Sequence, residues 1–355
     1  MPKTAALFDV QQHFGAKADD STDDSPRVTE AIDACVANGG GTVYFRTGTY
    51  RLASPIVVNA DQVTFLGANR VGTKLRFDPD LPVNLDLGDN VTQRHYFTIE
   101  RMTVTSNGTT GTIVRARKID QFMFIGCQFS GGGRVMDFHE PVSCSLFGCG
   151  ISTSSVDGLV MDNGDQCQIV GNYFEDQAGR PIHLKLTSGN KNYSIIGNNF
   201  STGVKAMEIG TGPNTEHAIV GNTVENCIHG IGLRAGGVGL TRSTVVGNSL
   251  RGTAVAGGQG LGIGTENSDL LISGNQVTNY ETNLFDGGAP SSVLVFGNPG
   301  IANRSFLTVV ATASLPAASA AMDGTTLIED AGAGNRNLIV YAGGERFRID
   351  GGAAI

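Results

Sequence analysis

The chain has 355 residues, of which 50 are glycine and only 16% are charged, and its formal net charge is −8. This composition indicates many short strands joined by tight turns, and the negative charge argues against binding to nucleic acid. The sequence contains no run of 18 apolar residues, which is the length needed to cross a membrane as a helix. The N-terminal segment lacks the apolar stretch of a classical signal peptide. Six cysteines without zinc spacing indicate buried, reduced thiols, and we expect no metal or cofactor.

The first 52 residues are expected to form an N-terminal cap. The stretch "DSP" at 24–26 is typical of a helix start, because proline fits the first turn and acidic groups favour the positive end of the helix dipole. The apolar residues that follow share one helical face: Val28, Ala31, Ile32 and Cys35. The glycines of "NGGG" would end this helix, and "TVYF" and "GTYRL" predict two strands. Such a helix would cover the first turn of a solenoid. The acids of "DDSTDD" are expected to cap it, since they lack the spacing of an EF-hand calcium loop.

Residues 53–300 contain a repeat. Segments such as "FIGCQF", "IVGNYF" and "IVGNTV" recur, and their glycines are 22 to 27 residues apart: Gly126, Gly148, Gly171, Gly197, Gly221, Gly247, Gly274 and Gly297. This period corresponds to one supersecondary unit per repeat. Leucine-rich repeats would need a leucine ladder, which the chain lacks. We therefore predict a parallel β-helix with a corner at each glycine, where the following asparagines stack along the axis: Asn172, Asn198, Asn222, Asn248 and Asn275.

The N-terminal motifs resemble a known family signature. "FGAKADDSTDD", "AIDAC" and "GGGTVYFRTGTY" follow one another in the order and spacing found in the pectate-lyase-like superfamily of right-handed parallel β-helices. That superfamily includes phage tailspikes and related polysaccharide-acting proteins. The signature covers about residues 14–52, and the repeats extend the resemblance to about residue 297. It implies the fold specifically and the reaction only weakly.

After residue 300 the period stops. Short strands and glycine-rich turns predict a small C-terminal β module over residues 301–355, similar to terminal modules of phage and prophage tail proteins. A module of this size is marginally stable alone. By resemblance to tailspikes, which are trimers, we expect a homotrimer held partly by this module.

A charged face is predicted about a dozen residues after each corner. "RVMDFHE", "DGLVMDN", "RPIHLKL", "KAMEIGT", "HGIGLRA" and "QGLGIGT" align with alternating inward and outward positions. The expected inward pairs include Ile182 with Leu184. The first outward column then holds Asp137, Val160, His183, Glu208, Gly232 and Gly262. The second holds His139, Asp162, Lys185, Gly210, Arg234 and Gly264. Glycine on the last rung leaves room for a ligand against the sheet.

Two outward carboxylates are the predicted catalytic acid and base. Asp162 and Glu208 would lie two rungs apart with His183 and Lys185 between them, and the cation would keep one carboxylate ionised. The other charged side chains would bind substrate: Asp137, His139 and Arg234. An alternative is a lyase in which Lys185, Arg234 or a histidine removes a proton beside a uronate carboxyl. The charges could equally be surface ion pairs of little energetic weight.

The sequence thus predicts a phage tailspike-like protein that binds and depolymerises a bacterial surface polysaccharide, in the virion tail or outside the cell. Two alternatives stay open. One is a non-catalytic structural or receptor-binding tail protein. The other is a secreted polysaccharide lyase or epimerase of the pectate-lyase type.

Overall fold

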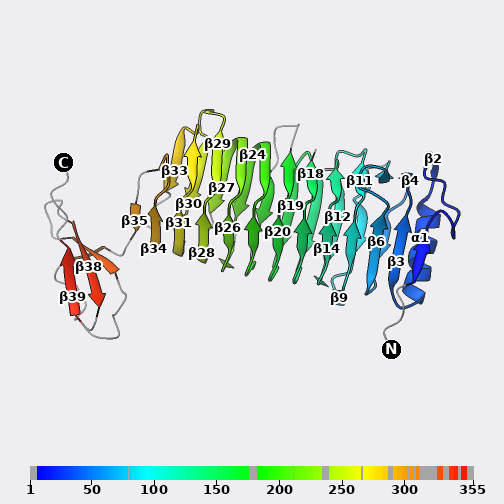
Figure 1. The fold of residues 1–355 in the computed structure, drawn as a ribbon, viewed down its shortest axis with the longest axis horizontal. Coiled ribbons are helices and arrows are strands. Elements are labelled where there is room, and N and C mark those ends of the chain that lie inside the picture. The colour runs from blue at the N-terminus through cyan, green and yellow to red at the C-terminus, as the bar shows by residue number, and fades with distance from the viewer. Residues whose placement is uncertain are drawn as a thin grey trace.

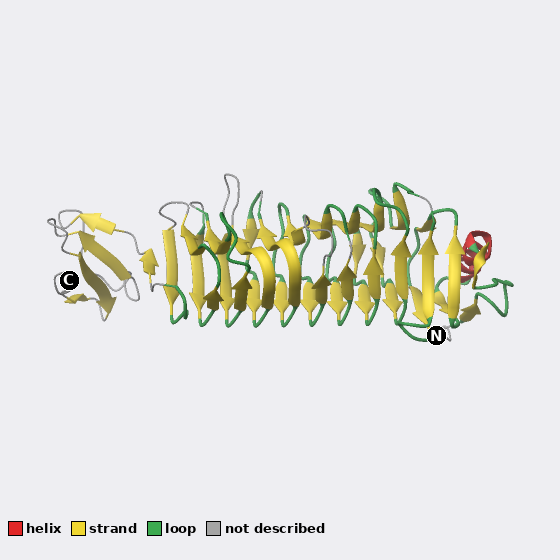
Figure 2. Cartoon of the chain, turned by 90° about the horizontal axis from the view of Figure 1, so that it is seen from above, coloured by secondary structure: helices red, strands yellow, loops and turns green. Residues whose placement is uncertain are grey.

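The computed structural model describes residues 6–349, apart from 79, 153, 176–181, 211, 234–239, 265–266, 287–290, 302–303, 307–308, 312–325, 331–335 and 343–344. Most of the described chain forms a right-handed parallel β-helix of about ten coils, stacked along the long axis (Figure 1). Seen from above, its strands lie side by side and the helix lies at the N-terminal end (Figure 2). The predicted all-β solenoid is confirmed.

Most coils contribute one strand to the first sheet. Its strands pair in parallel along the axis, except for the last pair, which is antiparallel. They are β1 (Leu7–Asp9), β3 (Gly41–Phe45), β6 (Val63–Gly67), β10 (Thr98–Glu100), β14 (Met123–Ile125), β17 (Ser145–Phe147), β20 (Gln168–Val170), β23 (Ser194–Ile196), β26 (Ala218–Val220), β28 (Leu240–Val246), β31 (Ser268–Ser273), β34 (Ser291–Phe296) and β35 (Arg304–Phe306), with β25 (Asn214–Thr215) beside β28. A separate pair joins β9 (Arg94–His95) to β13 (Ile119–Asp120).

A second, larger sheet contains two series of strands. The first series comprises β2 (Asp19–Asp23), β4 (Gly48–Leu52), β7 (Thr73–Phe77), β11 (Thr103–Ser106), β15 (Gln128–Ser130), β18 (Gly150–Ser152), β21 (Tyr173–Glu175), β29 (Ser249–Gly252) and β32 (Gln276–Thr278). The second comprises β5 (Ile56–Val58), β8 (Val83–Leu87), β12 (Thr112–Arg117), β16 (Arg134–His139), β19 (Asp157–Asp162), β22 (Ile182–Leu186), β30 (Gln259–Ile263) and β33 (Thr282–Asp286). The long strands β24 (Asn199–Ile209) and β27 (Thr223–Leu233) run through both series.

The corner glycines take a left-handed backbone conformation. The φ angles of Gly126 and Gly171 are +58° and +65°, a region that residues with a Cβ disfavour. The Oδ1 atom of Asn198 accepts hydrogen bonds from the backbone and side-chain amides of Asn172, at 2.9 and 3.0 Å. The same two bonds link each later asparagine to the next: Asn198, Asn222, Asn248, Asn275 and Asn298. The predicted stack is confirmed and reaches one coil further.

The N-terminal helix covers the first coils. Helix α1 (Ser25–Ala37) contacts β1, β3, β4 and β5, and its predicted apolar face is buried. Asp24 at the N-cap makes no capping bond, because its carboxylate accepts the amides of Lys17 and Ala18, both at 2.8 Å. The amide of Ser25 donates instead to Asp23, at 3.0 Å. The expected cap is therefore wrong for Asp24, whose carboxylate stabilises the preceding loop.

The core between the sheets is filled by aliphatic and aromatic side chains. All six cysteines are buried and free, as predicted. Beyond residue 301, four strands form a sheet of their own: β36 (Val309–Ala311), β37 (Thr326–Asp330), β38 (Arg336–Ala342) and β39 (Glu345–Ile349). We retain the division at residues 52 and 300 as a proposal.

Candidate functional site

The outward side of the second series, from β12 to β30, is called the charged face here. Its strand register defines three columns of side chains that run along the solenoid axis. The first column contains Arg134, Asp157, Ile182, Lys205, His229 and Gln259. The middle column contains Asp137, Val160, Lys185, Glu208, Gly232 and Gly262. The third contains Arg117, His139 and Asp162.

The expected outward position of His183 is wrong. Leu184 and Leu186, rather than Ile182 and Leu184, pair with the inward side chains of the next rung, so Lys185 moves to the middle column. His183 is 2% exposed and lies among Phe174 and Phe200. The reason is that two consecutive side chains face the core where the coil bends, as the burial of Ala206 and Met207 on the next rung also shows. Arg234, predicted to bind substrate, lies outside the described residues.

A hollow of about 570 Å³ contains His139 and Asp162 and is called the His139 hollow. The Nδ1 atom of His139 lies 3.0 Å from Oδ2 of Asp162. The other carboxylate oxygen accepts the hydroxyls of Thr187 and Ser188, at 2.6 and 3.0 Å. Burial raises the pKa of Asp162, but these hydrogen bonds and the nearby His139 outweigh it, so the pKa lies below its ordinary value. The imidazole is thus held by a carboxylate that is itself fixed in place.

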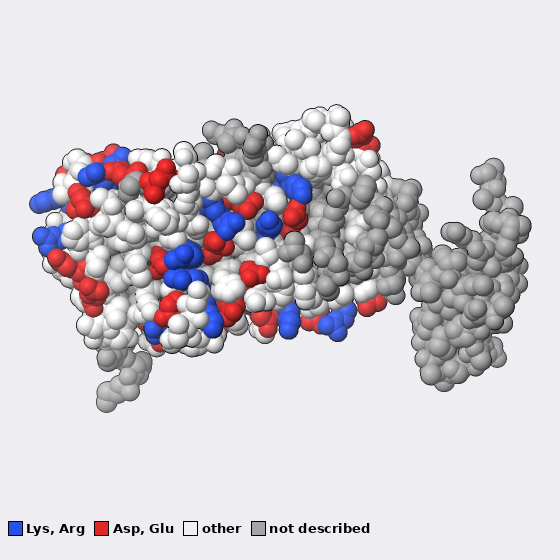
Figure 3. Space-filling model, turned by 180° about the vertical axis from the view of Figure 1, so that it is seen from behind, with Lys and Arg blue, Asp and Glu red and all other residues white. Residues whose placement is uncertain are grey.

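Most other cations of the face are paired. Arg115 donates two hydrogen bonds to Asp86, at 3.0 and 2.7 Å, and Arg117 donates one, at 2.9 Å. Arg134 bonds to Asp137 at 2.7 Å. Acidic and basic side chains lie interleaved on the side of the molecule seen in Figure 3. Ion pairing therefore accounts for much of the predicted charged ladder. Lys185 forms no ion pair with any residue that the structure describes.

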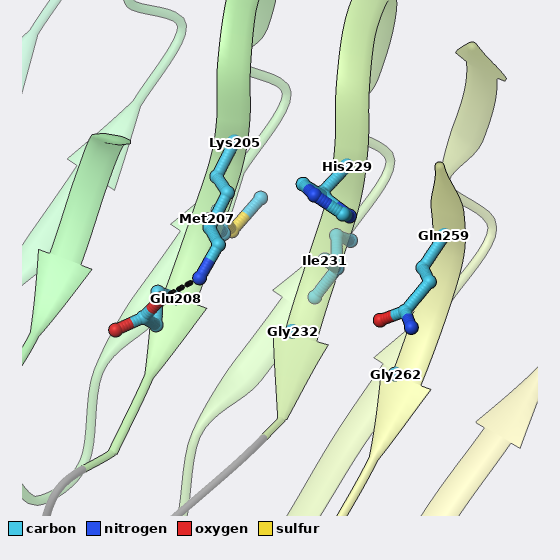
Figure 4. A pocket seen from close by; sticks show the side chains of 8 residues that line it. All are labelled: Lys205, Met207, Glu208, His229, Ile231, Gly232, Gln259 and Gly262. Carbon is cyan, nitrogen blue, oxygen red and sulfur yellow. Dashed lines mark hydrogen bonds and ion pairs between the residues drawn. The ribbon is translucent and has the colours of Figure 1, made fainter. Parts of the chain in front are cut away.

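A second hollow, of about 170 Å³, lies over Gly232 and Gly262 and is called the Gly232 hollow (Figure 4). Its rim is made by Lys205, Glu208, His229 and Gln259, from β24, β27 and β30. Lys205 and Glu208 form an ion pair. The predicted room over the glycine rungs therefore exists. The sequence analysis missed three of the rim residues, although each stands first in its aligned segment, "KAMEIGT", "HGIGLRA" or "QGLGIGT".

Asp162 and Glu208 do not face each other across the sheet. The register partner of Glu208 two rungs away is Val160, and Asp162 lies two residues further along that strand. Rung spacing and rise per residue then put about 12 Å between the two Cα positions. Asp162 belongs to the His139 hollow and Glu208 to the Gly232 hollow.

No group of three or more His, Cys, Asp or Glu side chains within the described ranges is placed to hold a metal ion. Among these residues, no helix is long and apolar enough to cross a membrane.

Other proteins share this fold and parts of this sequence. Mannuronan C5-epimerase AlgE1 of Azotobacter vinelandii is 48% identical over 48 residues, which are 14% of this chain and 3% of the epimerase. The N-terminal fragment of gene product 12 of bacteriophage Phi29 is 14% identical, with a TM-score of 0.58, over 96% of this chain and 73% of that one. ORF18 of Geobacillus virus E2 is 17% identical, with a TM-score of 0.53, over 96% of this chain and 68% of that one. At these identities the two viral structures share the fold alone.

The match to a protein family is more extensive. Residues 7–254, well over half of the chain, match the family described as "Rhamnogalacturonase A/epimerase, pectate lyase-like". The matched range covers the cap helix, the His139 hollow, most of the Gly232 hollow and most of the coils. The chain therefore belongs to the rhamnogalacturonase A/epimerase family of pectate lyase-like proteins.

Proposed function

We propose that this protein binds a polysaccharide along the charged face and cleaves it at the His139 hollow. The observation that carries the proposal is the bond between His139 and an Asp162 carboxylate that Thr187 and Ser188 fix in place. A histidine oriented in this way by a carboxylate is a common arrangement for a general base. It lies in an open hollow on the face of the solenoid where a long chain molecule can lie flat.

The two ring nitrogens would have separate tasks. With its proton on Nδ1, His139 donates to Asp162, and Nε2 is then the basic atom. The Nε2 atom lies 3.3 Å from Glu140. After His139 has taken a proton, the imidazolium would therefore face a carboxylate at each nitrogen, which stabilises its charge. Asp162 stays ionised throughout because its pKa is lowered.

We propose elimination as the reaction. His139 would remove the proton from the carbon next to a uronate carboxylate, and the electrons of that C–H bond would form a carbon–carbon double bond. The bond from the sugar ring to the leaving oxygen would break, and its electron pair would stay on that oxygen, which takes up a proton from water. Lys185 would face the uronate carboxylate, because its ammonium forms no ion pair with the described residues. Hydrolysis by Asp162 and Glu208 fits less well. Inverting glycosidases place their two carboxyl groups about 6.5–9.5 Å apart, whereas the Cα positions of Asp162 and Glu208 are about 12 Å apart and the two side chains belong to different hollows. This choice replaces the predicted acid–base pair with the lyase alternative.

We also propose that the cleavage takes place in a tailspike-like assembly in a virion tail or outside the cell. The support is that each of the two viral structures can be superposed on 96% of the length of this chain. The family name and the epimerase relative support a polysaccharide substrate. A bacterial surface polysaccharide as the natural substrate and a homotrimer as the assembly remain parts of this proposal. The rival is a tail protein whose solenoid binds glycans without cleaving them.

A product assay tests the proposed reaction. The full chain is incubated with polygalacturonate, alginate, gellan, xanthan and bacterial capsular polysaccharides, and unsaturated uronates and reducing ends are measured separately. Elimination predicts that both products appear in equal amounts. New reducing ends without unsaturated uronates would show that the reaction is hydrolysis rather than elimination. Binding without either product would favour the non-cleaving tail protein.

A further inference from the structure

Gly232 is a glycine that the fold does not require. Its φ lies outside the left-handed region, and a Cβ added there would meet only the carbonyl oxygen of Met207, at 3.6 Å, which is ordinary contact. Gly230, on the same strand, is different, because a Cβ there would come 2.2 Å from the carbonyl oxygen of Gly260. Glycine inside a strand weakens it, and it often marks a place where a ligand approaches the backbone. Gly232 therefore keeps a surface open that any other residue would fill.

The missing side chain produces the Gly232 hollow. The three preceding positions of the middle column carry side chains, namely Val160, Lys185 and Glu208, and the column then drops to glycine at two successive rungs. In Figure 4 the rim side chains stand around this bare stretch of sheet. At about 170 Å³ the hollow is smaller than sites for drug-sized ligands. Its size suits a single sugar ring.

The rim chemistry suits an uncharged ligand. Lys205 and Glu208 neutralise each other, so this hollow presents no excess charge of either sign from that pair. The amide of Gln259 and the imidazole of His229 carry hydrogen-bonding atoms that match the hydroxyl groups of a sugar. Gly232 is partly exposed, and neither Gly232 nor Gly262 carries a side chain that would hold a sugar ring away from the sheet. The His139 hollow, by contrast, is lined by three arginines, two carboxylates and a histidine.

We propose that the Gly232 hollow is a second glycan subsite, which holds one uncharged sugar residue of the same chain that is cleaved at His139. This inference rests on the proposed function. Gly232 on β27 lies three rungs from Asp162 on β19, a separation of about 14 Å along the axis. One chain must span both hollows. A polysaccharide that carries an uncharged sugar at this distance from the cleaved uronate should therefore bind more tightly than a polymer of uronate alone.

Affinity electrophoresis of the full chain tests the subsite. The gels contain either gellan, whose repeat combines glucuronate with uncharged sugars, or polygalacturonate, which consists of uronate alone. Gly232→Val places a side chain in the hollow, and its Cβ would lie at an ordinary contact distance from the backbone. Ala218→Val, on β26 of the other sheet, also introduces a valine at a partly exposed strand position, away from the charged face. We expect wild type and Ala218→Val to bind gellan about tenfold more tightly than Gly232→Val does. All three proteins should bind polygalacturonate with the same affinity, which is weaker than the affinity of the wild type for gellan.

The outcomes separate this inference from the function on which it depends. Equal gellan affinity in wild type and Gly232→Val, with unchanged melting temperatures, would overturn the subsite and leave the proposed function standing. Tighter binding of polygalacturonate than of gellan by the wild type would also overturn it. Wild type that binds neither polysaccharide and cleaves none of the panel would overturn the proposed function itself. Gly232→Ala provides a smaller insertion, for which an intermediate affinity is expected.

Discussion

Asn198 accepts two hydrogen bonds from Asn172 through a single buried oxygen, one from the backbone amide and one from the side-chain amide. The amide group of Asn198 in turn donates to the carbonyl of Ile169, at 2.7 Å, and to the next asparagine. Each asparagine therefore connects three coils. Because the side chains are 0–4% exposed, water cannot replace these bonds. The column holds the corners of successive coils in register, and the position of every outward residue depends on that register.

Removal of one asparagine should destabilise the solenoid. In Asn222→Ala, the buried amides of Asn198 lose their acceptor, and the carbonyl of Ile195 loses its donor. Unsatisfied buried polar groups cost about 1–3 kcal/mol each, so we expect a loss of about 3 kcal/mol or more. Urea unfolding measures it. Gln168→Ala, at an exposed position of β20, is the control, and equal stability of both variants would show that the column contributes nothing.

Two glycines should respond oppositely to alanine. Gly171 has a φ of +65° and no atom within 4 Å of an added Cβ, so its strain is purely conformational. Gly171→Ala should cost about 1–2 kcal/mol of unfolding free energy. Gly232→Ala should leave the free energy of unfolding unchanged or raise it by up to about 1 kcal/mol, because alanine has fewer backbone conformations than glycine to lose when the chain folds. Thermal unfolding of both variants measures the difference, and a destabilised Gly232→Ala would mean that the fold itself needs this glycine.

His217 predicts a dependence of stability on pH. Burial lowers the pKa of His217 from 6.5 to about 4, and its ring lies beside Tyr193. Below pH 6.5 the unfolded chain binds a proton that the folded chain does not. Stability should therefore fall as the pH decreases from 6.5 to about 4, by about 3 kcal/mol in total. Urea unfolding at several pH values measures this slope. His217→Gln should flatten it, and an unchanged slope would assign the effect to other groups.

The oligomeric state tests the predicted role of the C-terminal residues. We expect light scattering to give a trimer for the full chain at micromolar concentration. Deletion of residues 301–355 should weaken or abolish the trimer, because we expect so small a module to gain its stability from contacts within the trimer. A stable monomer of the full chain would contradict the prediction. A deletion variant that remains a trimer would place the contacts on the solenoid instead.

Backbone demands made most of the fold predictable. Gly171 is readable from sequence because a left-handed corner selects glycine, and Asn172 because each coil needs the same buried bonds. The register of β22 was not readable. Its segment has apolar side chains at 182, 184 and 186, so two registers two residues apart bury equally apolar sets. The bend decides between them, since Gly203 leaves space in which the His183 ring lies.

The candidate site was predicted in outline for a similar reason. Alternation along strands identifies the face, and therefore Asp162 and Glu208, but it does not give the bonding partners of these side chains. Lys205 and Glu208 pair within one strand, and Asp162 bonds to residues that follow β22. The pattern of apolar and polar residues in "KAMEIGT" does not show which side chains bond to each other or how far apart they lie. The two hollows became distinct only once the columns were aligned.

Turnover by a His139 variant tests the central claim most directly. The claim is that His139 acts as a base positioned by Asp162. With the polysaccharide that the wild type cleaves fastest, His139→Gln should lower kcat by about 10²–10⁴-fold at an unchanged melting temperature. His95→Gln is the matched control, because His95 makes a similar surface contact, 3.2 Å from Asp120, away from the charged face. Full turnover by His139→Gln, or an equal loss in both variants, would contradict the account.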